Sequence, residues 1–409
     1  MSYKTKEVIA SMRDETAEVV IIGGGIIGMS IAYYTAKAGM DVLVVEQGEI
    51  AGGTSSKCDG NILAIDKDPG FDSQMSLKSQ ELVKEWVRDL DEEFEYRAPG
   101  SILVCETDEE MIAAESWVAR QREAGLPFRM LDQKDLRDEW PYMAEDLPGG
   151  LECATDSTVN PVLLTYSLAS TARRYGARLR THSPVTGIQL DEGRKVCAVE
   201  TSEGRIRTSI VINAAGVWAK HIGRMVGIDI PIEPRKGHIL VASRWANIGK
   251  RKVMEFGYLM SKFGGTRSVD PKFDRYGVAL VFEPTASQNF LIGSSRQFVG
   301  MDSGVDQQVI SLIAERAIRF FPVLEQIPLL RTYAGLRPWT ADHLPIVSAI
   351  DEVPGFYVAA GHEGDGISLA AVTGKVISEM LSGAATCIPL NRLRYDRFHG
   401  MPHPQEVIR

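Results

Sequence analysis

Three glycines and an acid near the start of the chain have types and spacing suited to binding a nucleotide. Gly23, Gly25 and Gly28 form the pattern Gly-x-Gly-x-x-Gly, and Glu46 follows them. In such a pattern the first glycine permits a tight turn, the second lets backbone approach a pyrophosphate, and the third lets a helix pack close to a strand. The carboxylate of Glu46 can accept hydrogen bonds from both hydroxyls of a ribose, and it would repel a 2′-phosphate. The pattern indicates a dinucleotide site; the alternative is a glycine-rich turn that only packs a helix on a sheet.

These residues need a strand on each side and a helix between them. The apolar runs Val19–Ile22 and Val42–Val45 each predict a short buried strand. Between them, residues 26–38 predict a helix that Gly39 ends. The free N–H groups and the dipole at the start of this helix would favour phosphates. The unit reads as strand, turn, helix and strand, which is the context that the glycine pattern requires.

Similar small-residue segments recur at the ends of other predicted strands. The loop 51–56 follows the second strand, and Ile210–Asn213 predicts a strand that runs into Ala214, Ala215 and Gly216. Near the C-terminus, a predicted strand at 355–360 leads through a glycine-rich turn to a helix from about Ile367 to Leu381. Ligands of open α/β sheets bind outside the carboxyl ends of the strands, so these segments belong to the same predicted site.

Composition excludes several classes of function. The chain has 409 residues, 44% of them hydrophobic and 24% charged, as in an ordinary globular protein of two or three domains. The net charge of -9 gives no support for a nucleic-acid partner. No apolar run approaches the roughly 20 residues that span a bilayer, and the first residues lack the apolar core of a signal peptide. We therefore expect a cytoplasmic protein.

The five cysteines are scattered, without a CxxC pair or the spacing of metal ligands. This distribution argues for a reducing compartment and against a zinc or iron–sulfur site in this chain. We therefore predict no metal site. Cys58 lies close to the predicted nucleotide loop, where we interpret it as a packing residue rather than a nucleophile.

The order of these motifs resembles that of the FAD-dependent D-amino acid oxidase superfamily. The resemblance rests on the N-terminal glycine motif with Glu46, on Ala-Ala-Gly-Val-Trp at 214–218, on Gly-Leu-Arg-Pro-Trp-Thr-Ala-Asp-His-Leu-Pro at 335–345, and on the glycine-rich turn 361–366. It covers about residues 18 to 385. The segments 58–63, 234–240 and 361–370 resemble most closely the flavoprotein (beta) subunits of heteromeric hydroxyproline, opine and cyanide-forming glycine dehydrogenases.

The resemblance implies a fold and a division into domains. The fold is α/β, with a Rossmann-like FAD-binding domain of the glutathione-reductase type interleaved with an α+β substrate-binding cap that has a mainly antiparallel sheet. The expected ranges are 17–95, 146–230 and 335–390 for the FAD-binding domain, 96–145 and 231–334 for the cap, 1–16 for an N-terminal extension and 391–409 for a C-terminal tail. Residues 139–150, with two prolines and two glycines, are expected to connect the domains.

The resemblance also implies the residues that hold a non-covalent FAD. Those expected along the cofactor are Gly23, Gly25, Gly28, Glu46, Thr54, Ser55, Val185, Ala215, Gly216, Trp218, Gly361, Gly364, Asp365, Gly366 and Ile367. The second helix start would favour the negative charge of a reduced flavin. Because an acid there would oppose that charge, we expect Glu363 to point away or toward a partner.

Three further residues are implied at the reacting end. Arg337 is the expected clamp for a substrate carboxylate, since its planar fork suits bidentate pairing; the alternative is a structural salt bridge. Tyr258 matches the carboxylate-binding tyrosine of the cap sheet, with core packing as its alternative. His238 is a candidate to face the active site, although a hydrogen-bonded structural histidine is the alternative we favour.

The implied reaction is oxidation of the C–N bond of an amino acid or a carboxylated secondary amine, such as hydroxyproline, proline, an opine or glycine. A hydride would pass to flavin N5 and the electrons to a partner or acceptor. Small iron–sulfur or flavin-binding subunits are the expected partners in a hetero-oligomer. Two alternatives stay open: an FAD-dependent 2-hydroxy-acid or glycerol-phosphate dehydrogenase, which would need a histidine base, and a non-catalytic electron-transfer or scaffold subunit.

Overall fold

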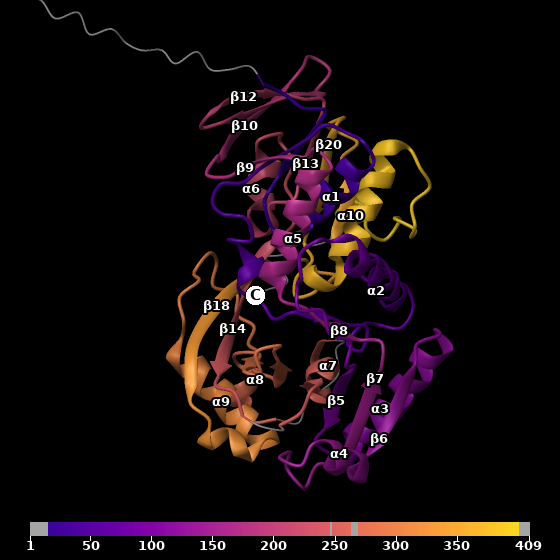
Figure 1. The fold of residues 1–409 in the computed structure, drawn as a ribbon, viewed down its shortest axis with the longest axis vertical. Helices are drawn as coiled ribbons and strands as arrows, with labels where there is room; N and C mark the ends of the chain where they lie inside the picture. The colour runs from indigo at the N-terminus through magenta and orange to yellow at the C-terminus, as the bar shows by residue number, and fades with distance from the viewer. Residues whose placement is uncertain (1–14, 246–247, 263–268, 401–409) are drawn as a thin grey trace, which may run out of the picture.

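The computed structural model describes residues 15–245, 248–262 and 269–400, with the side chains of 260–262 left aside. Two large sheets dominate it, one in the upper and one in the lower half of Figure 1. The predicted N-terminal extension and C-terminal tail fall partly outside the described residues.

The upper sheet has six strands in the order β19-β20-β13-β2-β3-β9. Neighbours pair in parallel except β19 and β20, and the glycine motif follows β2 in the middle of the sheet. These strands are β2 (Val19–Ile22), β3 (Val42–Val45), β9 (Arg178–Arg180), β13 (Ile210–Asn213), β19 (Ile346–Ala349) and β20 (Phe356–Ala360). The predicted Rossmann-like architecture is confirmed, since the nucleotide motif opens from the centre of a mainly parallel sheet.

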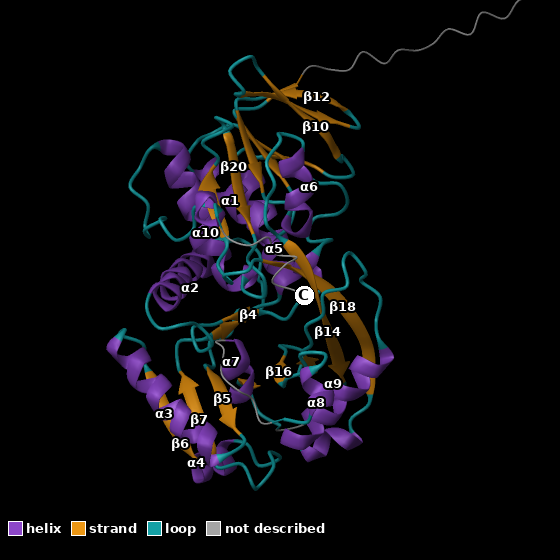
Figure 2. Ribbon diagram, turned by 180° about the vertical axis from the view of Figure 1, so that it is seen from behind, coloured by secondary structure: helices purple, strands orange, loops and turns teal. Residues whose placement is uncertain are grey.

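Four helices pack together beside this sheet, as Figures 1 and 2 show. They are α1 (Ile26–Lys37), α2 (Phe71–Asp89), α5 (Pro161–Arg174) and α10 (Gly366–Ser382). Helices α1 and α10 approach closely because Gly374 has no side chain: a Cβ there would lie 2.2 Å from Ser30 Oγ. Ser30 Oγ donates to the carbonyl of Ala370 at 2.7 Å. The two glycine-rich turns are therefore held by helices that are fixed to each other.

The lower sheet has eight strands in the order β18-β14-β17-β16-β15-β5-β7-β6. All pairs are antiparallel except β15 with β5, which confirms the mainly antiparallel cap. The strands are β5 (Ser101–Cys105), β6 (Phe128–Asp132), β7 (Gly149–Cys153), β14 (Glu233–Ala242), β15 (Lys252–Glu255), β16 (Val281–Pro284), β17 (Phe290–Gly293) and β18 (Leu329–Trp339). The helices of this half are α3 (Asp108–Glu123), α4 (Gln133–Glu139), α7 (Phe256–Lys262), α8 (Pro271–Asp274) and α9 (Gln307–Phe320).

One expectation about the connections is wrong. Residues 139–150 do not connect the two halves, because β7 begins at Gly149 and pairs with β5 and β6 inside the lower sheet. The prolines and glycines there instead carry the chain from α4 back to the same sheet. The domain boundary predicted at residue 146 thus precedes a strand of the lower sheet, and β18 crosses the one predicted at 335.

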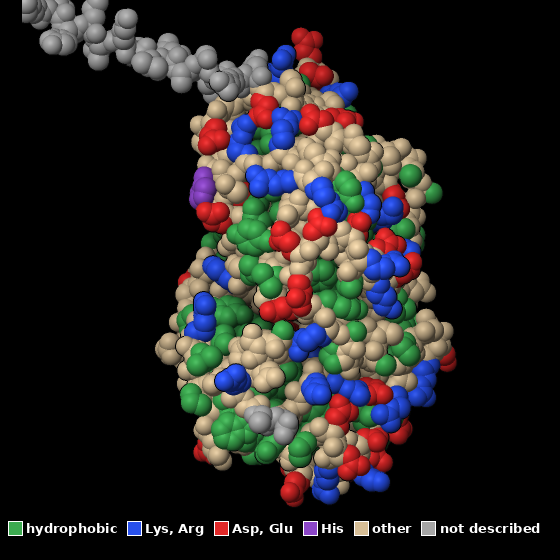
Figure 3. All heavy atoms as spheres, viewed as in Figure 1, with side chains coloured by type: hydrophobic (Ala, Val, Ile, Leu, Met, Phe, Trp, Pro, Cys, Tyr) green, Lys and Arg blue, Asp and Glu red, His purple; other side chains and the backbone are tan. Residues whose placement is uncertain are grey.

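Two small sheets complete the fold. The first has the order β1-β12-β11-β10, formed by β1 (Glu15–Thr16), β10 (Val185–Leu190), β11 (Val196–Thr201) and β12 (Gly204–Arg207). The second pairs β4 (Asn61–Ile62) with β8 (Ser157–Thr158) between the two halves. Helix α6 (Ala219–Arg224) follows β13. On the face drawn in Figure 3, acidic and basic side chains are interspersed.

Candidate functional site

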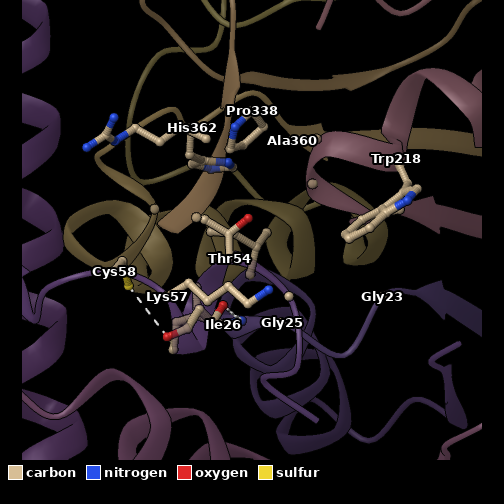
Figure 4. Close-up of a pocket in the computed structure, with 18 of the residues that line it drawn as sticks. Gly23, Gly25, Ile26, Thr54, Lys57, Cys58, Trp218, Pro338, Ala360 and His362 are labelled. Atoms are coloured by element: carbon tan, nitrogen blue, oxygen red, sulfur yellow. Dashed lines mark hydrogen bonds between the residues drawn. The ribbon is translucent and has the colours of Figure 1, made fainter. Parts of the chain in front are cut away.

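A cavity of about 460 Å³ lies at the carboxyl ends of the central parallel strands. Figure 4 shows Gly25, Thr54, Trp218 and His362 around it. Twelve of the fifteen residues expected along the cofactor line it: Gly23, Gly25, Glu46, Thr54, Ser55, Val185, Ala215, Gly216, Trp218, Gly364, Gly366 and Ile367. Gly28, Gly361 and Asp365 lie outside this lining. The chain thus brings segments more than three hundred residues apart in sequence to one cavity.

Two of the three motif glycines, Gly25 and Gly28, have different surroundings. A Cβ on Gly25 would have only Ser55 Oγ near it, at 3.3 Å, so its open side faces the cavity. A Cβ on Gly28 would lie 1.9 Å from the carbonyl oxygen of Gly23, so this glycine serves packing of the helix on the turn. The observed surroundings fit a pyrophosphate beside Gly25, at the start of α1.

Glu46 is fixed at the tip of β3 by the backbone. Its carboxylate accepts hydrogen bonds from the amides of Gly24, at 2.6 Å, and Gly48, at 2.8 Å. Each carboxylate oxygen can accept a further bond, so the side chain keeps capacity for the ribose hydroxyls. The acid is thereby held in one orientation at the lining of the cavity.

The hydroxyls of the following loop are used within the protein. Thr54 Oγ1 donates to the carbonyl of Leu336 at 2.6 Å, and Ser55 Oγ accepts from the amide of Ile26 at 3.0 Å. The loop is therefore tied both to β18 and to the first turn of α1. Because Ser55 accepts in that bond, its hydroxyl can still donate to a ligand in the main cavity, which Ser55 lines.

The two acids of the glycine-rich turn before α10 each have a cation. Glu363 pairs with the guanidinium of Arg235 and lies 2.8 Å from His343 Nδ1. Asp365 lies 2.5 Å from Nζ of Lys67, which is fully buried and also contacts Asp66 at 2.6 Å. The expectation that Glu363 turns toward a partner is confirmed. Neither carboxylate therefore opposes negative charge at the start of α10 as an unpaired acid.

Arg337 lies in the wall between the main cavity and a second one of about 60 Å³. Its guanidinium packs on Gly237, where a Cβ would be 2.3 Å from Nη1, and it donates to the carbonyl of Ser295 at 2.8 Å. A Cβ on Gly364 would lie 3.9 Å from Arg337 Nε. The guanidinium thus lies next to the turn that leads into α10. Burial lowers the pKa of Arg337 from its usual value.

Tyr258 lines the second cavity together with Arg337. The expectation that Tyr258 belongs to the cap sheet is wrong, because it lies in helix α7, directly after β15. It is half-buried, and the guanidinium of Arg296 lies 3.9 Å from the centre of its ring. The structure therefore brings the predicted clamp and the predicted tyrosine to one small polar cavity.

His238 lies outside the lining of both cavities. Its ring is fully buried, with Nδ1 2.8 Å from Ser295 Oγ and Nε2 accepting from the amide of Asp306 at 3.1 Å. Burial and the nearby Lys236 lower the pKa of His238 to about 4. His362 lines the main cavity but bonds to Thr373 Oγ1 at 2.9 Å, and burial lowers its pKa to about 4 as well. Both rings are neutral near pH 7.

Five charged residues of the second cavity were not assigned a role from the sequence. They are Asp59, Asp66, Arg235, Lys252 and Arg296. Asp59 and Arg235 had a usable signal, because they lie in the segments 58–63 and 234–240 that carry the family resemblance. Nothing in the sequence marked Asp66, Lys252 and Arg296, which lie after β4, at the start of β15 and after β17.

Within the described residues, no helix is long and apolar enough to cross a membrane, and no group of three or more potential ligands is arranged to hold a metal.

Comparison with known proteins gives matches along nearly the whole chain. Residues 18–380 match the family model described as DAO, FAD dependent oxidoreductase. The chain is 28% identical over 437 residues to the hydrogen cyanide synthase subunit HcnC of Pseudomonas aeruginosa, covering 96% of this chain and 99% of that protein. It is 29% identical over 378 residues to mitochondrial dimethylglycine dehydrogenase of Rattus norvegicus, covering 90% of this chain and 43% of that protein. The crystal structure of L-proline dehydrogenase from P. horikoshii superposes with a TM-score of 0.85 at 25% identity, covering 95% and 99% of the two chains.

Proposed function

The chain belongs to the family of FAD-dependent oxidoreductases, and from that premise we propose that it oxidises the C–N bond of an amino acid or a carboxylated secondary amine. The observation that carries the proposal is the position of Arg337, between the main cavity and the small polar one. A guanidinium binds a carboxylate through two parallel hydrogen bonds. The names of the relatives support it, because dimethylglycine and L-proline are both carboxylated amines.

The proposed reaction removes a hydride from the carbon beside the nitrogen and a proton from the nitrogen, and leaves a C=N bond. FAD accepts the hydride when bound, and water then splits the imine into a carbonyl compound and an amine. The residues of the chain supply position: Arg337 would hold the carboxylate beside Gly364, and the start of α10 would favour negative charge next to it. Tyr258 would support the same carboxylate from α7.

The state of the two histidines favours an amine over a hydroxy acid as substrate. Oxidation of an alcohol needs a base for the hydroxyl proton. His238 has both ring nitrogens engaged, and His362 is bound to Thr373, with pKa values of both lowered to about 4. Histidines in this state are weak bases at neutral pH, whereas a neutral amine carries its own lone pair.

We further propose that partner subunits with iron–sulfur or flavin sites accept the electrons. The support is the name of HcnC, which is a subunit of hydrogen cyanide synthase, together with the free, scattered cysteines of the described part of this chain. Co-purification of an untagged neighbour with a tagged chain would test this part separately.

The central experiment is anaerobic mixing of the purified flavoprotein with a panel of carboxylated amines, the matching amines without carboxylate, and 2-hydroxy acids. We expect the visible flavin absorbance to be lost only with carboxylated amines. Bleaching by hydroxy acids alone would refute the proposal. Retention of the oxidised spectrum with every compound, while dithionite still bleaches it, would favour a non-catalytic subunit instead.

A further inference from the structure

Asp59 lines both cavities, as Arg337 does, so the two side chains lie at their junction. An α-amino acid near pH 7 carries an ammonium group on the same carbon as its carboxylate. Arg337 is the proposed partner of the carboxylate, and Asp59 has the charge that suits the ammonium group. Glu363 also lines both cavities, but each of its oxygens already has a partner, Arg235 or His343. The junction therefore matches both charges of an amino acid.

Oxidation of such an amine requires that the ammonium group first lose a proton. The lone pair of the nitrogen forms the C=N bond as the hydride leaves, and an ammonium nitrogen has no lone pair to give. His238 and His362 are poor acceptors, because burial lowers the pKa of each to about 4. A different group near the junction has to take the proton.

Lys252 connects Asp59 to a second carboxylate, that of Glu283. Its Nζ lies 2.9 Å from Asp59 Oδ2 and 3.8 Å from Glu283 Oε2. Lys252 and Glu283 lie in the neighbouring strands β15 and β16, and both are buried. Lys252 lines the second cavity, whereas Glu283 lies outside both linings and accepts from the amide of Gly60 at 3.2 Å. We call Asp59, Lys252 and Glu283 the carboxylate–lysine triad.

Glu283 is the member of this triad that can hold a proton near neutral pH. Burial raises its pKa to about 7; the charge of Lys252 opposes the rise, and that of Asp59 adds to it. Burial also raises the pKa of the Cys58 thiol and of the Tyr333 hydroxyl, so both stay neutral. The charged and polar groups near Glu283 on the surrounding elements are Lys252, Asp59, the Gly60 amide, Arg97, the Cys58 thiol and the Tyr333 hydroxyl.

Asp59 has the opposite tendency. Burial alone would raise its pKa, but Lys252 and Arg337 lower the pKa below its usual value, so Asp59 is ionised at neutral pH. Two acids whose surroundings separate their pKa values suit different parts of one proton transfer. Asp59 can meet the ammonium group as an anion, and Glu283 can keep the proton.

We propose that the carboxylate–lysine triad accepts the proton of the substrate's ammonium group and that Glu283 keeps it. The inference rests on the proposed oxidation of carboxylated amines. The proton passes from nitrogen to Asp59, Lys252 gives one of its own protons to Glu283, and Asp59 passes its proton on to Lys252. The nitrogen regains its lone pair and Glu283 becomes neutral, while Asp59 and Lys252 end as they began. Asp59 is the catalytic residue of this step, and Glu283 acts through it.

The transfer can be measured without turnover by using amino acids that have no hydrogen on the carbon beside the nitrogen. We would add 2-aminoisobutyrate or 1-aminocyclopropanecarboxylate to the oxidised flavoprotein at about pH 8, where Glu283 is ionised. Binding is followed by the perturbation of the flavin spectrum, and protonation by the infrared difference spectrum. We expect the C=O stretch of a newly protonated carboxyl group to appear on binding. Isobutyrate, which lacks the amine, should not produce this band, and a bound amino acid without the band would overturn the inference.

Four variants assign the band. Glu283→Gln keeps an acceptor for the Gly60 amide and should abolish the band, whereas Glu283→Asp keeps a carboxyl group, should restore it and guards against misfolding. Asp59→Asn should also abolish it, because the path to Glu283 is cut. Asp156→Asn is the matched control: Asp156 is a buried acid whose pKa burial raises to about 6, it lies outside both cavities, and its replacement should leave the band unchanged. A band that survives in Glu283→Gln would refute the proposed acceptor.

Turnover separates this inference from the function it rests on. With a carboxylated amine below saturation, the rate of anaerobic flavin reduction should rise as the pH passes about 7, because only ionised Glu283 accepts the proton. Glu283→Gln should lack this rise and react about a hundredfold more slowly at about pH 8. If the rise persists in Glu283→Gln, the inference fails and oxidation of carboxylated amines stands. If no amine reduces the flavin, the proposed function fails, and the infrared experiment still decides whether Glu283 receives the proton.

Discussion

Replacing Gly25 and Gly28 separately by alanine should separate cofactor binding from folding. Both glycines belong to the same motif and lie three residues apart, yet their surroundings differ. The open side of Gly25 faces the main cavity, whereas that of Gly28 faces the backbone of Gly23. One methyl group therefore meets the cofactor at the first position and the protein at the second.

The magnitudes follow from the distances. At Gly28 the added Cβ would lie 1.9 Å from the carbonyl oxygen of Gly23, and reaching 3.0 Å requires a shift of 1.1 Å (3.0 minus 1.9) between α1 and the turn. Such overpacking costs about 1–3 kcal/mol of folding free energy. At Gly25 the nearest atom is 3.3 Å away and φ is −79°, which alanine adopts readily. Alanine also lowers the conformational entropy of the unfolded chain, which stabilises the folded state by about 0.4–1 kcal/mol and offsets the remaining strain.

We therefore expect Gly25→Ala to fold as well as the wild type without FAD, within about 0.5 kcal/mol. Its affinity for FAD should fall about ten- to hundredfold, because the methyl group displaces a charge-assisted phosphate contact. Gly28→Ala should lose about 1–3 kcal/mol of stability even without FAD. Urea denaturation of the FAD-free proteins and fluorescence titration with FAD measure the two quantities.

The reasoning would be refuted by a reversed pattern. If FAD-free Gly25→Ala were destabilised and Gly28→Ala were not, the two glycines would have the opposite roles. Equal loss of FAD affinity in both, with unchanged stability, would show that Gly28 is not needed for packing of the helix on the turn. The double variant should combine both losses, since each acts on a different quantity.

Three further changes test other parts of the site. Arg337→Met should raise the half-saturating concentration of a carboxylated amine about ten- to hundredfold in anaerobic flavin reduction, and Arg337→Lys should restore it only in part. An unchanged half-saturating concentration in Arg337→Met would show that Arg337 does not hold the carboxylate. Glu363→Gln breaks the buried contact with Arg235 and should lower the unfolding free energy, measured by urea denaturation, by about 3 kcal/mol or more. The control Lys78→Met breaks an exposed pair and should change the unfolding free energy by less than about 0.5 kcal/mol. Equal effects of the two variants would contradict the stabilising role of the buried pair. Burial raises the pKa of Asp156 from 3.8 to about 6, so the folded state favours the protonated acid. The free energy of unfolding should therefore fall by up to about 3 kcal/mol as the pH rises from about 4 to about 6. The variant Asp156→Asn should lack this fall. If the unfolding free energies of the variant and the wild type changed with pH in parallel, Asp156 would not be its source.

The strands and helices around the glycine motif were predictable because their signals are local. The strand Val19–Ile22 has the predicted bounds, and α1 ends at Lys37, one residue before the predicted end. The helix α5 begins at Pro161 with Asn160 as its cap, and proline at a first helical position is a local signal of the same kind. In these cases apolar periodicity, a cap and a glycine or proline stop agree, and packing does not override them.

The surroundings of Arg337 were not predictable, because they depend on the register between distant strands. Arg235 faces Arg337 only through the pairing of β14 with β18, about a hundred residues apart, and Arg296 arrives from the end of β17. Register follows from which face of a strand is buried, and β14 and β17 are buried along most of their length. Alternation therefore gave no indication of which side chains would meet. The misplaced connection at 139–150 has the same origin, since nothing local distinguishes a return to the same sheet from a passage to another.

The order of strands in the upper sheet has a consequence for synthesis of the protein. The strand β13 pairs with β20, and Val211 is opposite Phe356, which the ribosome adds 145 residues later (356 minus 211). At about 5–20 residues per second, that interval lasts roughly 7 to 29 s. During it, the apolar strand β13 presents an unpaired edge next to β2 while the lower sheet is still being made. Productive folding in the cell therefore depends on what shields this edge, and slowing translation between residues 213 and 356 should lower the yield of folded protein.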